Sequence, residues 1–421
     1  IDATPWQTLL DACGVQREQI DKVAQWYCQA KHVVFAWGMG MTHHQHGVDN
    51  IECIANLALL RGMVGKRYAG LLPLRGHSNV QGIGTIGVKP VLAAEVFAGI
   101  EAHFGVKLPP EEGLHTLAAL ESAHAGGIDA ALMMGGNLYA ATPQSAWAEQ
   151  AFNRIGFKLY LTTTINQGHL YGVDHGETLV LPVAARDEEP QPTSQESMFN
   201  YVRLSDGGIE RLPEARSEVW ILSRLGRALL PDSPIDFRQF EQHRKVREAI
   251  AAVVPGMEAL ADIDVARREF TVSGRVLHSP VFRTGSGRAS FVTIDLPQRS
   301  ERAETFPYTL MTLRSEGQFN SIIYEEKDSY RGVDSRWTLM MNAEDMAAQA
   351  LRDGDLVCVR SSCGEMRDLC VKALNLPRGN VAAYYPQANV LTERQTDVRS
   401  HTPNFKSVPV AICRSPVSEA G

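Results

Sequence analysis

The stretch Ala130-Ala-Leu-Met-Met-Gly-Gly-Asn137 contains an apolar run that ends in a pair of glycines. Such a short, continuous apolar run is typical of a β-strand. Gly135 and Gly136 permit a sharp turn after the strand, and Thr142 with Pro143 favours the start of a helix beyond it. A strand, a tight turn and a helix form the repeating unit of an α/β fold.

The same order of elements occurs elsewhere in the chain. Residues 32–36 form an apolar, β-branched run that ends at Trp37-Gly-Met-Gly40, and residues 48–63 carry apolar side chains at helical spacing. Further strands are predicted over residues 157–161 and 178–181. Strands that alternate with helices indicate parallel sheets. Ligands of such sheets bind at the carboxyl ends of the strands, where both glycine turns lie.

The pattern changes in the second half of the chain. Residues 207–261 are predicted to be mainly helical. Beyond Phe306 short strands dominate, with one helix near residues 343–350; the strands are predicted over residues 308–311, 356–360, 366–371 and 381–384. This series of short strands indicates a separate β-rich domain, which we expect to be a barrel. The predicted regions are therefore two α/β domains, a helical connection and a β domain, over residues 1–77, 78–205, 206–304 and 305–421.

Composition narrows the class of protein. The net charge is −7, which argues against a nucleic-acid partner because phosphates require a basic face. The best candidate for a membrane span, residues 88–100, is shorter than the about 20 residues needed and carries Lys89 and Glu95. Seven scattered cysteines without a CxxC pair indicate a reducing compartment, so we expect a cytoplasmic protein. The chain begins with Ile1 rather than Met, so we expect a processed or truncated piece.

Two polar segments are candidates for binding. Arg75-Gly-His-Ser-Asn79 places a cation, an imidazole and two hydrogen-bonding side chains in an irregular stretch, which suits an anion or a polar cofactor but also an ordinary surface loop. Arg314-Ser-Glu-Gly-Gln-Phe-Asn320 follows a predicted strand, and Arg331 and Arg336 come soon after. These arginines either clamp phosphates or form a charged loop.

Two further motifs are weaker evidence for a binding site. Gly82-Ile-Gly-Thr-Ile-Gly87 matches the GxGxxG pattern, but no strand precedes it, so a nicotinamide-binding dehydrogenase is disfavoured. His43, His44 and His46 could bind a metal, yet a polar loop beside a cofactor or solvent is favoured.

The chain resembles the formate dehydrogenase branch of the dimethyl sulfoxide reductase family of molybdopterin oxidoreductases. The segments that carry the resemblance are residues 37–42, 48–60, 75–82, 342–345, 353–355 and 402–406. His77 stands where the branch usually has Gln, which points to the subgroup of formate dehydrogenase alpha-subunit-like proteins. The resemblance implies parallel-sheet, Rossmann-like domains that each take one nucleotide, followed by a C-terminal six-stranded β-barrel of double-psi type that covers the pterins.

The resemblance implies two molybdopterin guanine dinucleotides that hold one molybdenum or tungsten. Carried over by position, Gly38, Met39 and Gly40 approach one dinucleotide, and Gly135, Gly136 and Asn137 cradle the phosphates of the other. Guanine contacts fall to Thr163 and Asn166, where the family usually has an acidic residue. The remaining residues expected to contact the cofactor are Ser78, Arg314, Glu316, Gly317, Gln318, Asn320, Asn389, Phe405 and Lys406.

The implied reaction is the oxidation of formate to CO2. Arg75 would hold the substrate carboxylate, and His77 would be its hydrogen-bond or proton partner. The cysteine or selenocysteine that ligates the metal, and the cysteines of a 4Fe-4S cluster, are expected upstream of this chain, which then provides no metal ligand itself. An electron-transfer partner is expected as well. The alternatives are another small oxoanion or sulfoxide as substrate, and a non-catalytic fragment.

Overall fold

The computed structural model describes residues 4–275, 277–297 and 304–415. The chain forms two compact units. The first unit contains Ile1–Arg75, Gly274–Glu304 and Gln395–Lys406, and the second contains Gly76–Ser273, Thr305–Arg394 and Ser407–Gly421. Among the described residues, no helix combines the length and the apolar character that crossing a bilayer requires.

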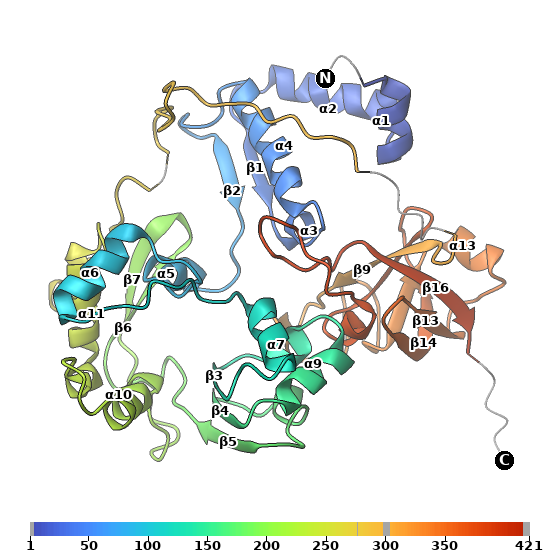
Figure 1. The fold of residues 1–421 in the computed structure, drawn as a ribbon. Helices are drawn as coiled ribbons and strands as arrows, with labels where there is room; N and C mark the ends of the chain where they lie inside the picture. Colours follow the sequence, from blue (N-terminus) through green and yellow to red (C-terminus); the bar gives the residue numbers. More distant parts are fainter. Residues whose placement is uncertain (1–3, 276, 298–303, 416–421) are drawn as a thin grey trace, which may run out of the picture. The chain divides into compact units, whose positions relative to one another are not determined.

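The first unit is built around a short parallel strand pair. Its elements are α1 (Trp6–Cys13), α2 (Arg17–Gln29), β1 (Val34–Trp37), α3 (Met39–Thr42), α4 (Gly47–Leu60) and β2 (Gly70–Pro73). β1 pairs with β2 in parallel, with Val34 opposite Gly70 and Trp37 opposite Pro73. Helix α4 runs along this pair (Figure 1). Arg75 lies two residues beyond the carboxyl end of β2.

The second unit begins its α/β part with the predicted strand at residue 130. β3 (Ala130–Met134), β4 (Phe157–Thr162) and β5 (Glu177–Pro182) form a parallel sheet in the order β3-β4-β5. Trp147 and Phe152 of α9 (Ser145–Asn153) pack with Leu117 and Leu120 of α7 (Thr116–His124) in one apolar cluster. The short helix α8 (Leu138–Ala141) starts where the glycine turn ends. The predicted mixed α/β architecture with parallel sheets is confirmed.

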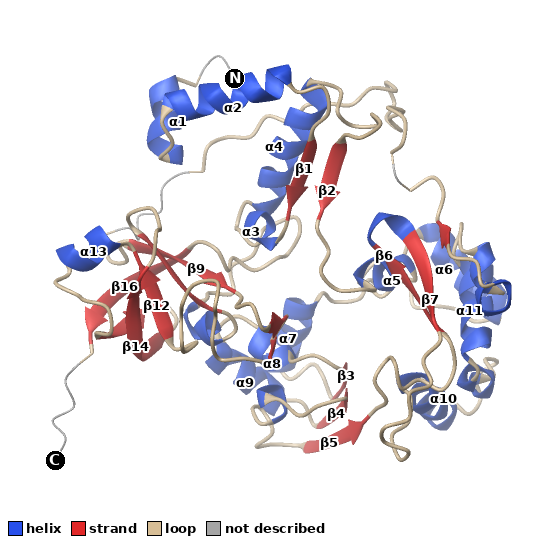
Figure 2. Ribbon diagram, turned by 180° about the vertical axis from the view of Figure 1, so that it is seen from behind, coloured by secondary structure: helices blue, strands red, loops and turns tan. Residues whose placement is uncertain are grey.

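The second unit also contains a group of helices around an antiparallel hairpin (Figure 2). The helices of this group are α5 (Val80–Thr85), α6 (Ala94–Phe104), α10 (Glu218–Leu229), η3 (Phe237–Glu241), α11 (His243–Val253) and α12 (Ile263–Ala266). An antiparallel sheet has the order β6 (Thr193–Ser197), β7 (Tyr201–Ser205) and β8 (Phe270–Thr271). Gly82 and Gly84 of the GxGxxG stretch lie within α5, so this stretch is not the turn of a nucleotide-binding fingerprint.

The C-terminal part of the second unit is a closed six-stranded barrel, as predicted. Its strands follow the order β12-β14-β13-β16-β9-β15. The elements are β9 (Tyr308–Leu313), β10 (Gln318–Phe319), β11 (Ile322–Ile323), β12 (Thr338–Met341), α13 (Ala343–Ala348), β13 (Leu356–Arg360), β14 (Glu365–Ala373), β15 (Asn380–Tyr384) and β16 (Val408–Arg414). Leu310, Leu339, Val357 and Leu369 fill the interior and are fully buried.

We predict that Leu369→Ala strongly destabilises the barrel. Leu369 is 0% exposed, so its truncation leaves a cavity that costs about 2–5 kcal/mol. Leu356→Ala is the matched control, because Leu356 lies on the neighbouring strand with half of its surface exposed. Hydrogen–deuterium exchange of peptides from β12 to β14 should accelerate in Leu369→Ala only. Equal protection in the two variants would contradict this account of the core.

Candidate functional site

The loop after β9 is organised by the side chain of Gln318. Its amide Nε2 donates to the carbonyl of Asn320 at 2.6 Å and to the carbonyl of Tyr385 at 2.8 Å. Its Oε1 accepts from the backbone N–H of Ser315 at 3.1 Å. Arg314 Nη2 donates to Asn320 Oδ1 at 2.9 Å. The predicted cofactor residues Arg314, Gln318 and Asn320 therefore lie together in one structured loop.

The side chain of a buried arginine anchors this loop through hydrogen bonds. Arg336 is 2% exposed and donates to Gln318 Oε1 at 2.9 Å, to the Tyr385 carbonyl at 2.5 Å and to Gln387 Oε1 at 3.1 Å. It also donates to the Ser315 hydroxyl. Burial lowers the pKa of Arg336. The guanidinium of Arg336 thus donates to protein groups, so this geometry does not support the alternative that Arg336 clamps phosphates.

Arg331 is also used within the protein. Its Nη1 lies 2.5 Å from Oδ2 of Asp328, which is 1% exposed, and the Tyr384 hydroxyl donates to the same carboxylate oxygen at 2.9 Å. Arg314 differs, because no carboxylate among the described residues pairs with it. It is half-buried, lies 5.3 Å from the centroid of the Tyr385 ring, and burial lowers its pKa. A desolvated cation without an acidic partner is stabilised by a bound anion.

His77 contacts the Arg314 loop. Its ring lies 4.6 Å from the ring of Phe319, at an interplanar angle of 80°. Phe319 belongs to β10, within the loop that Arg314 begins and Asn320 ends. Two segments that are more than two hundred residues apart in sequence therefore meet inside the second unit. Arg75 precedes His77 by two residues and is the last residue of the first of the three segments that form the first unit.

The residues after His77 are held by the β6–β7 hairpin. Arg186 Nη1 donates to Ser78 Oγ at 3.1 Å and Nη2 donates to Ser205 Oγ at 3.1 Å. The backbone N–H of Glu196 donates to Asn79 Oδ1 at 3.0 Å. Ser78 is thus fixed by a cation that donates to neutral side chains, Ser78, Gln195 and Ser205. Arg186 was missed by sequence reasoning, since its loop, Arg186-Asp-Glu-Glu-Pro-Gln-Pro192, shows no binding motif.

The loop that carries Arg186 is anchored by a buried acid–imidazole contact. Glu189 Oε2 lies 3.4 Å from His243 Nε2, and both residues are buried. Burial raises the pKa of Glu189 to about 7 and lowers the pKa of His243. Near neutral pH the contact is therefore closer to a neutral pair than to an ion pair.

The pH dependence of stability follows from this contact. The pKa of Glu189 in the folded protein is above its ordinary value of 4.5. The folded state therefore binds this proton more tightly than the unfolded state, and protonation stabilises the folded state at low pH. This contribution is lost as the pH rises from about 4.5 through about 7. Compared with Glu189→Gln, the unfolding free energy of the wild type should fall by about 2–3 kcal/mol between pH 5 and pH 8. Urea unfolding at each pH measures it, with the exposed Glu210→Gln as control. Parallel curves for wild type and Glu189→Gln would refute the assignment.

The glycine turn after β3 is open. Gly135 and Gly136 have φ values of +65° and +71°, and a Cβ at either position would meet no atom within 4 Å. Asn166 Nδ2 donates to the Gly136 carbonyl at 2.9 Å, and Asn137 Oδ1 accepts from the Ala140 N–H at 3.0 Å. The structure therefore brings Asn166 onto the turn. Thr163 is exposed and lies just beyond the end of β4.

Asn389 joins the turn to the barrel. It is 0% exposed and lies in the short helix η6 (Gln387–Leu391). Its Nδ2 donates to the Ala140 carbonyl at 2.6 Å, and its own carbonyl accepts from the Gln144 N–H at 2.8 Å. Its buried Oδ1 has no hydrogen-bond partner among the described residues. Because Gln387 in the same helix binds Arg336, the glycine turn and the Arg314 loop belong to one connected region.

The first unit collects the other predicted residues. Gly38, Met39 and Gly40 lie at the carboxyl end of β1. The backbone N–H groups of Phe405 and Lys406 both donate to the His43 carbonyl at 3.1 Å. The segment around residue 405 therefore contacts the loop that follows the glycine-rich turn.

The histidines of this turn have protein partners. His44 Nε2 lies 2.8 Å from the Gly40 carbonyl, and burial lowers the pKa of His44. His46 Nδ1 lies 3.1 Å from Asp49 Oδ2. Among the described residues, no group of three or more His, Cys, Asp or Glu side chains is placed to hold a metal ion.

Two predicted residues have less direct support. The Glu316 carboxylate accepts from the Ser329 hydroxyl, in the next loop. Gly317 packs closely on Glu325, with 3.0 Å between its ideal Cβ and the Glu325 Cβ. These contacts shape the loop and leave a cofactor role for either residue as a prediction.

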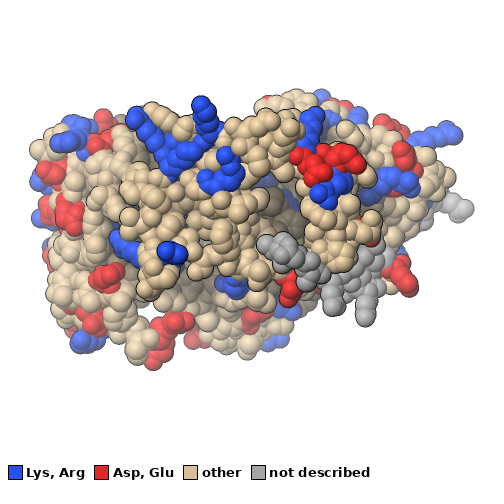
Figure 3. All heavy atoms as spheres, turned by 90° about the horizontal axis from the view of Figure 1, so that it is seen from above, with Lys and Arg blue, Asp and Glu red and all other residues tan. Residues whose placement is uncertain are grey.

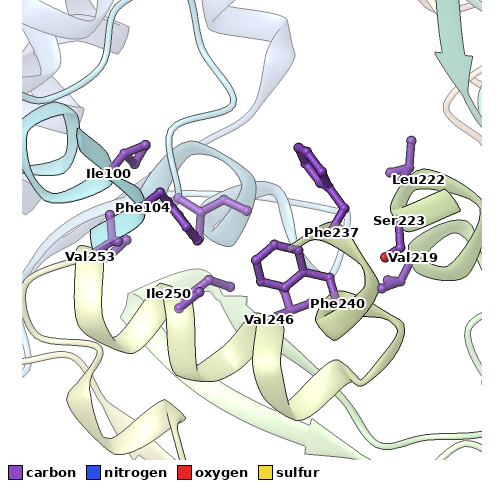
Figure 4. Close-up of a pocket in the computed structure, with 13 residues that line it drawn as sticks. Ile100, Phe104, Val219, Leu222, Ser223, Phe237, Phe240, Val246, Ile250 and Val253 are labelled. Atoms are coloured by element: carbon purple, nitrogen blue, oxygen red, sulfur yellow. The ribbon is translucent and has the colours of Figure 1, made fainter. Parts of the chain in front are cut away.

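An apolar pocket elsewhere in the second unit contains none of these residues. It has a volume of about 410 Å³, and Figure 4 shows Phe104, Phe237, Phe240 and Ile250 pointing into it from α6, η3 and α11. Ser223 is its one hydroxyl-bearing lining residue. It lacks the cations and amides of the candidate site, so we do not assign it to the same ligand.

The charged side chains on the surface are mixed in sign. Acidic and basic side chains lie interspersed on the face shown in Figure 3. The net charge of −7 is small for a chain of 421 residues. The positive charge available to an anion at the candidate site therefore depends on single residues such as Arg314.

We predict that Arg336→Met loosens the Arg314 loop. The change removes the buried guanidinium that donates to Gln318 and to the Tyr385 carbonyl, at a cost of about 3 kcal/mol in the free energy of unfolding. Hydrogen–deuterium exchange of a peptide covering residues 314–324 should accelerate, and the thermal unfolding temperature should fall. Arg367→Met is the control, because the Arg367 side chain is 73% exposed and surface ion pairs contribute little. Unchanged exchange in Arg336→Met would show that the loop is held by other contacts.

Comparison with known proteins agrees with this arrangement. The model of the family named Molybdopterin oxidoreductase matches residues 14–226, and the model of the Molydopterin dinucleotide binding domain matches residues 308–409. An uncharacterized oxidoreductase of Mycobacterium tuberculosis is 34% identical over 96% of this chain and 54% of its own length. The alpha subunit of an F420-dependent formate dehydrogenase of Methanocaldococcus jannaschii is 25% identical over 96% of this chain and 61% of its own length. The chain spans little more than half the length of these relatives.

The fold is also similar to a solved structure. Acetylene hydratase from Pelobacter acetylenicus superposes with a TM-score of 0.68 at 12% identity, over 97% of this chain and 64% of that one. At this identity the likeness concerns the fold alone.

Proposed function

Because this chain belongs to the molybdopterin oxidoreductase family, we propose that it forms the cofactor-binding part of an enzyme that oxidises formate to CO2. The observation that carries the proposal is the state of Arg314. Its guanidinium is half-buried, has no carboxylate partner among the described residues and lies in the loop that His77 contacts. An anionic group bound there would supply the missing charge.

The residues present fit two molybdopterin guanine dinucleotides. Gly135 and Gly136 leave room for phosphates beside the backbone, and the buried Oδ1 of Asn389 is available as an acceptor. Thr163 and Asn166 would contact guanine at this position. In the first unit, Gly38, Met39 and Gly40 would approach the other dinucleotide, with Phe405 and Lys406 beside the same turn. The remaining contacts are assigned to Ser78, Glu316, Gly317, Gln318 and Asn320.

Substrate binding is assigned to Arg75 and His77. The planar guanidinium of Arg75 would hold the formate carboxylate through two parallel hydrogen bonds. The His77 imidazole would take up the released proton, a task suited to a group that titrates near neutral pH. Its edge-to-face contact with Phe319 limits the orientations of the ring.

The bound cofactor, with molybdenum or tungsten, would supply the centre that takes two electrons from the substrate. In this proposal the thiolate or selenolate ligand of the metal and a 4Fe-4S cluster come from parts of the enzyme outside this chain. An electron-transfer partner as the acceptor and a cytoplasmic location are part of the same proposal. The relative from Methanocaldococcus jannaschii, a formate dehydrogenase subunit by name, supports formate as the substrate.

Arg75→Ala tests the substrate assignment. In the complete enzyme, we expect kcat/KM for formate to fall by about 100-fold or more, because a charge-assisted contact to the reacting anion is lost. Metal content measured by mass spectrometry should remain near that of the wild type. Arg227→Ala, an exposed change on α10, should leave both values unaltered.

The outcomes separate the alternatives. Turnover of nitrate or a sulfoxide with a viologen dye, without turnover of formate, would keep the cofactor and replace the substrate. A wild-type enzyme that holds no molybdenum or tungsten would support a non-catalytic fragment. Full formate turnover in Arg75→Ala would remove Arg75 from the substrate site.

A further inference from the structure

Two cysteines face each other on the outside of the barrel. Cys358 on β13 and Cys413 on β16 are register partners in an antiparallel pair. Directly opposed residues in such a pair project from the same face of the sheet. Val357 and Val359 belong to the barrel interior, so Cys358, which lies between them, points outward. Cys413 shares that outward face.

The two thiols differ in access to solvent. Cys413 is exposed, whereas Cys358 is 3% exposed. Cys413 Sγ lies 3.8 Å from the Cys358 carbonyl oxygen. Both cysteines line a pocket of about 950 Å³, together with Glu365 and Arg367. Burial and the neighbouring Cys413 thiol raise the pKa of Cys358 to about 11. A reagent in solution therefore meets Cys413 first.

The other cysteines of the barrel have no such partner. Cys370 on β14 lies opposite Leu356 and Thr338. Cys363 lies in the turn after β13, where its thiol donates to the Val390 carbonyl at 3.7 Å. Since no group of three ligating side chains is found among the described residues, the opposed pair suits thiol oxidation better than metal binding.

We propose that Cys358 and Cys413 form a reversible redox site that closes to a disulfide when a hydroperoxide oxidises it. Directly opposed residues have Cα atoms about 4.5–5.5 Å apart, within the range of about 4.4–6.8 Å that a disulfide spans. The site is independent of the metal cofactor and of the proposed substrate. Closing it would tie the last barrel strand to β13 across 55 residues of chain.

The chemistry proceeds in two balanced steps. The Cys413 thiolate attacks the O–O bond, becomes a sulfenic acid and, with one proton taken up, releases an alcohol or water. The Cys358 sulfur then displaces the hydroxyl group, which leaves as water with the Cys358 proton. Two thiols are oxidised to one disulfide, and one hydroperoxide is reduced. A dithiol reductant reverses the reaction by exchange.

Peptide mapping of the full chain tests the proposal. The protein is treated with hydrogen peroxide, blocked with N-ethylmaleimide, digested and analysed by mass spectrometry. We expect a linked pair of peptides containing Cys358 and Cys413, which dithiothreitol separates. Cys370→Ser, the control, should form the same link. In Cys358→Ser, dimedone should label Cys413, whereas in Cys413→Ser it should leave Cys358 unlabelled.

Three outcomes would overturn the proposal. Cys413 could stay a thiol under excess peroxide, become sulfinic acid without any link in the wild type, or link to a different cysteine. Because the decisive measurement uses the wild type, misfolding of a variant cannot decide the result.

Discussion

The buried guanidinium of Arg336 holds together the parts of the second unit from which the candidate site is built. It donates to the loop after β9, through Ser315 and Gln318, and to the segment after β15, through the Tyr385 carbonyl and Gln387. A charge that is 2% exposed requires such acceptors, which here receive hydrogen bonds from both Nη atoms, whereas the buried Nε has no partner among the described residues. The barrel supplies rigid strand ends, and this one cation fixes the loops that leave them.

The arginines of this region divide into two kinds by their partners. Arg331 is paired with Asp328, and Arg336 is surrounded by amide, hydroxyl and carbonyl oxygens. Arg314 has an amide oxygen and an aromatic face, which leave its charge uncompensated among the described residues. This difference is electrostatic and does not depend on the total charge of the chain. It explains why a chain with a net charge of −7 can still offer a local site to an anion.

The strongly apolar elements could be predicted from the sequence, because their pattern is local. Residues 130–134 and 157–161 are mainly apolar, and both form strands of the parallel sheet, although Leu132 and Met134 of the first strand are 42% and 47% exposed. The hairpin over β6 and β7 was not predicted, since Thr193-Ser-Gln-Glu-Ser197 is polar and gains its order from long-range pairing. The strands β12 and β16 were also absent from the local pattern. A barrel was expected from the run of short strands, but its six strands followed from the family resemblance alone.

The site could be predicted only in part. The resemblance pointed to Arg314, Gln318 and Asn320, and these three residues do lie in one hydrogen-bonded loop. Which arginine is buried and which is uncompensated could not be read from the sequence, because burial depends on the closed barrel. Their cofactor roles, the role of Arg75, and the domain boundaries after residues 77, 205 and 304 stay predictions.

The return of residues 395–406 to the first unit has a consequence for biosynthesis. The buried carboxylate of Asp397 accepts from the N–H of Val48, in the first turn of α4, and Arg399 pairs with Asp49 and Glu52 on the same helix. A ribosome makes α4 long before it makes these partners. The first unit therefore cannot make these contacts until the ribosome has synthesised some 350 further residues after Asp49, including most of the second unit.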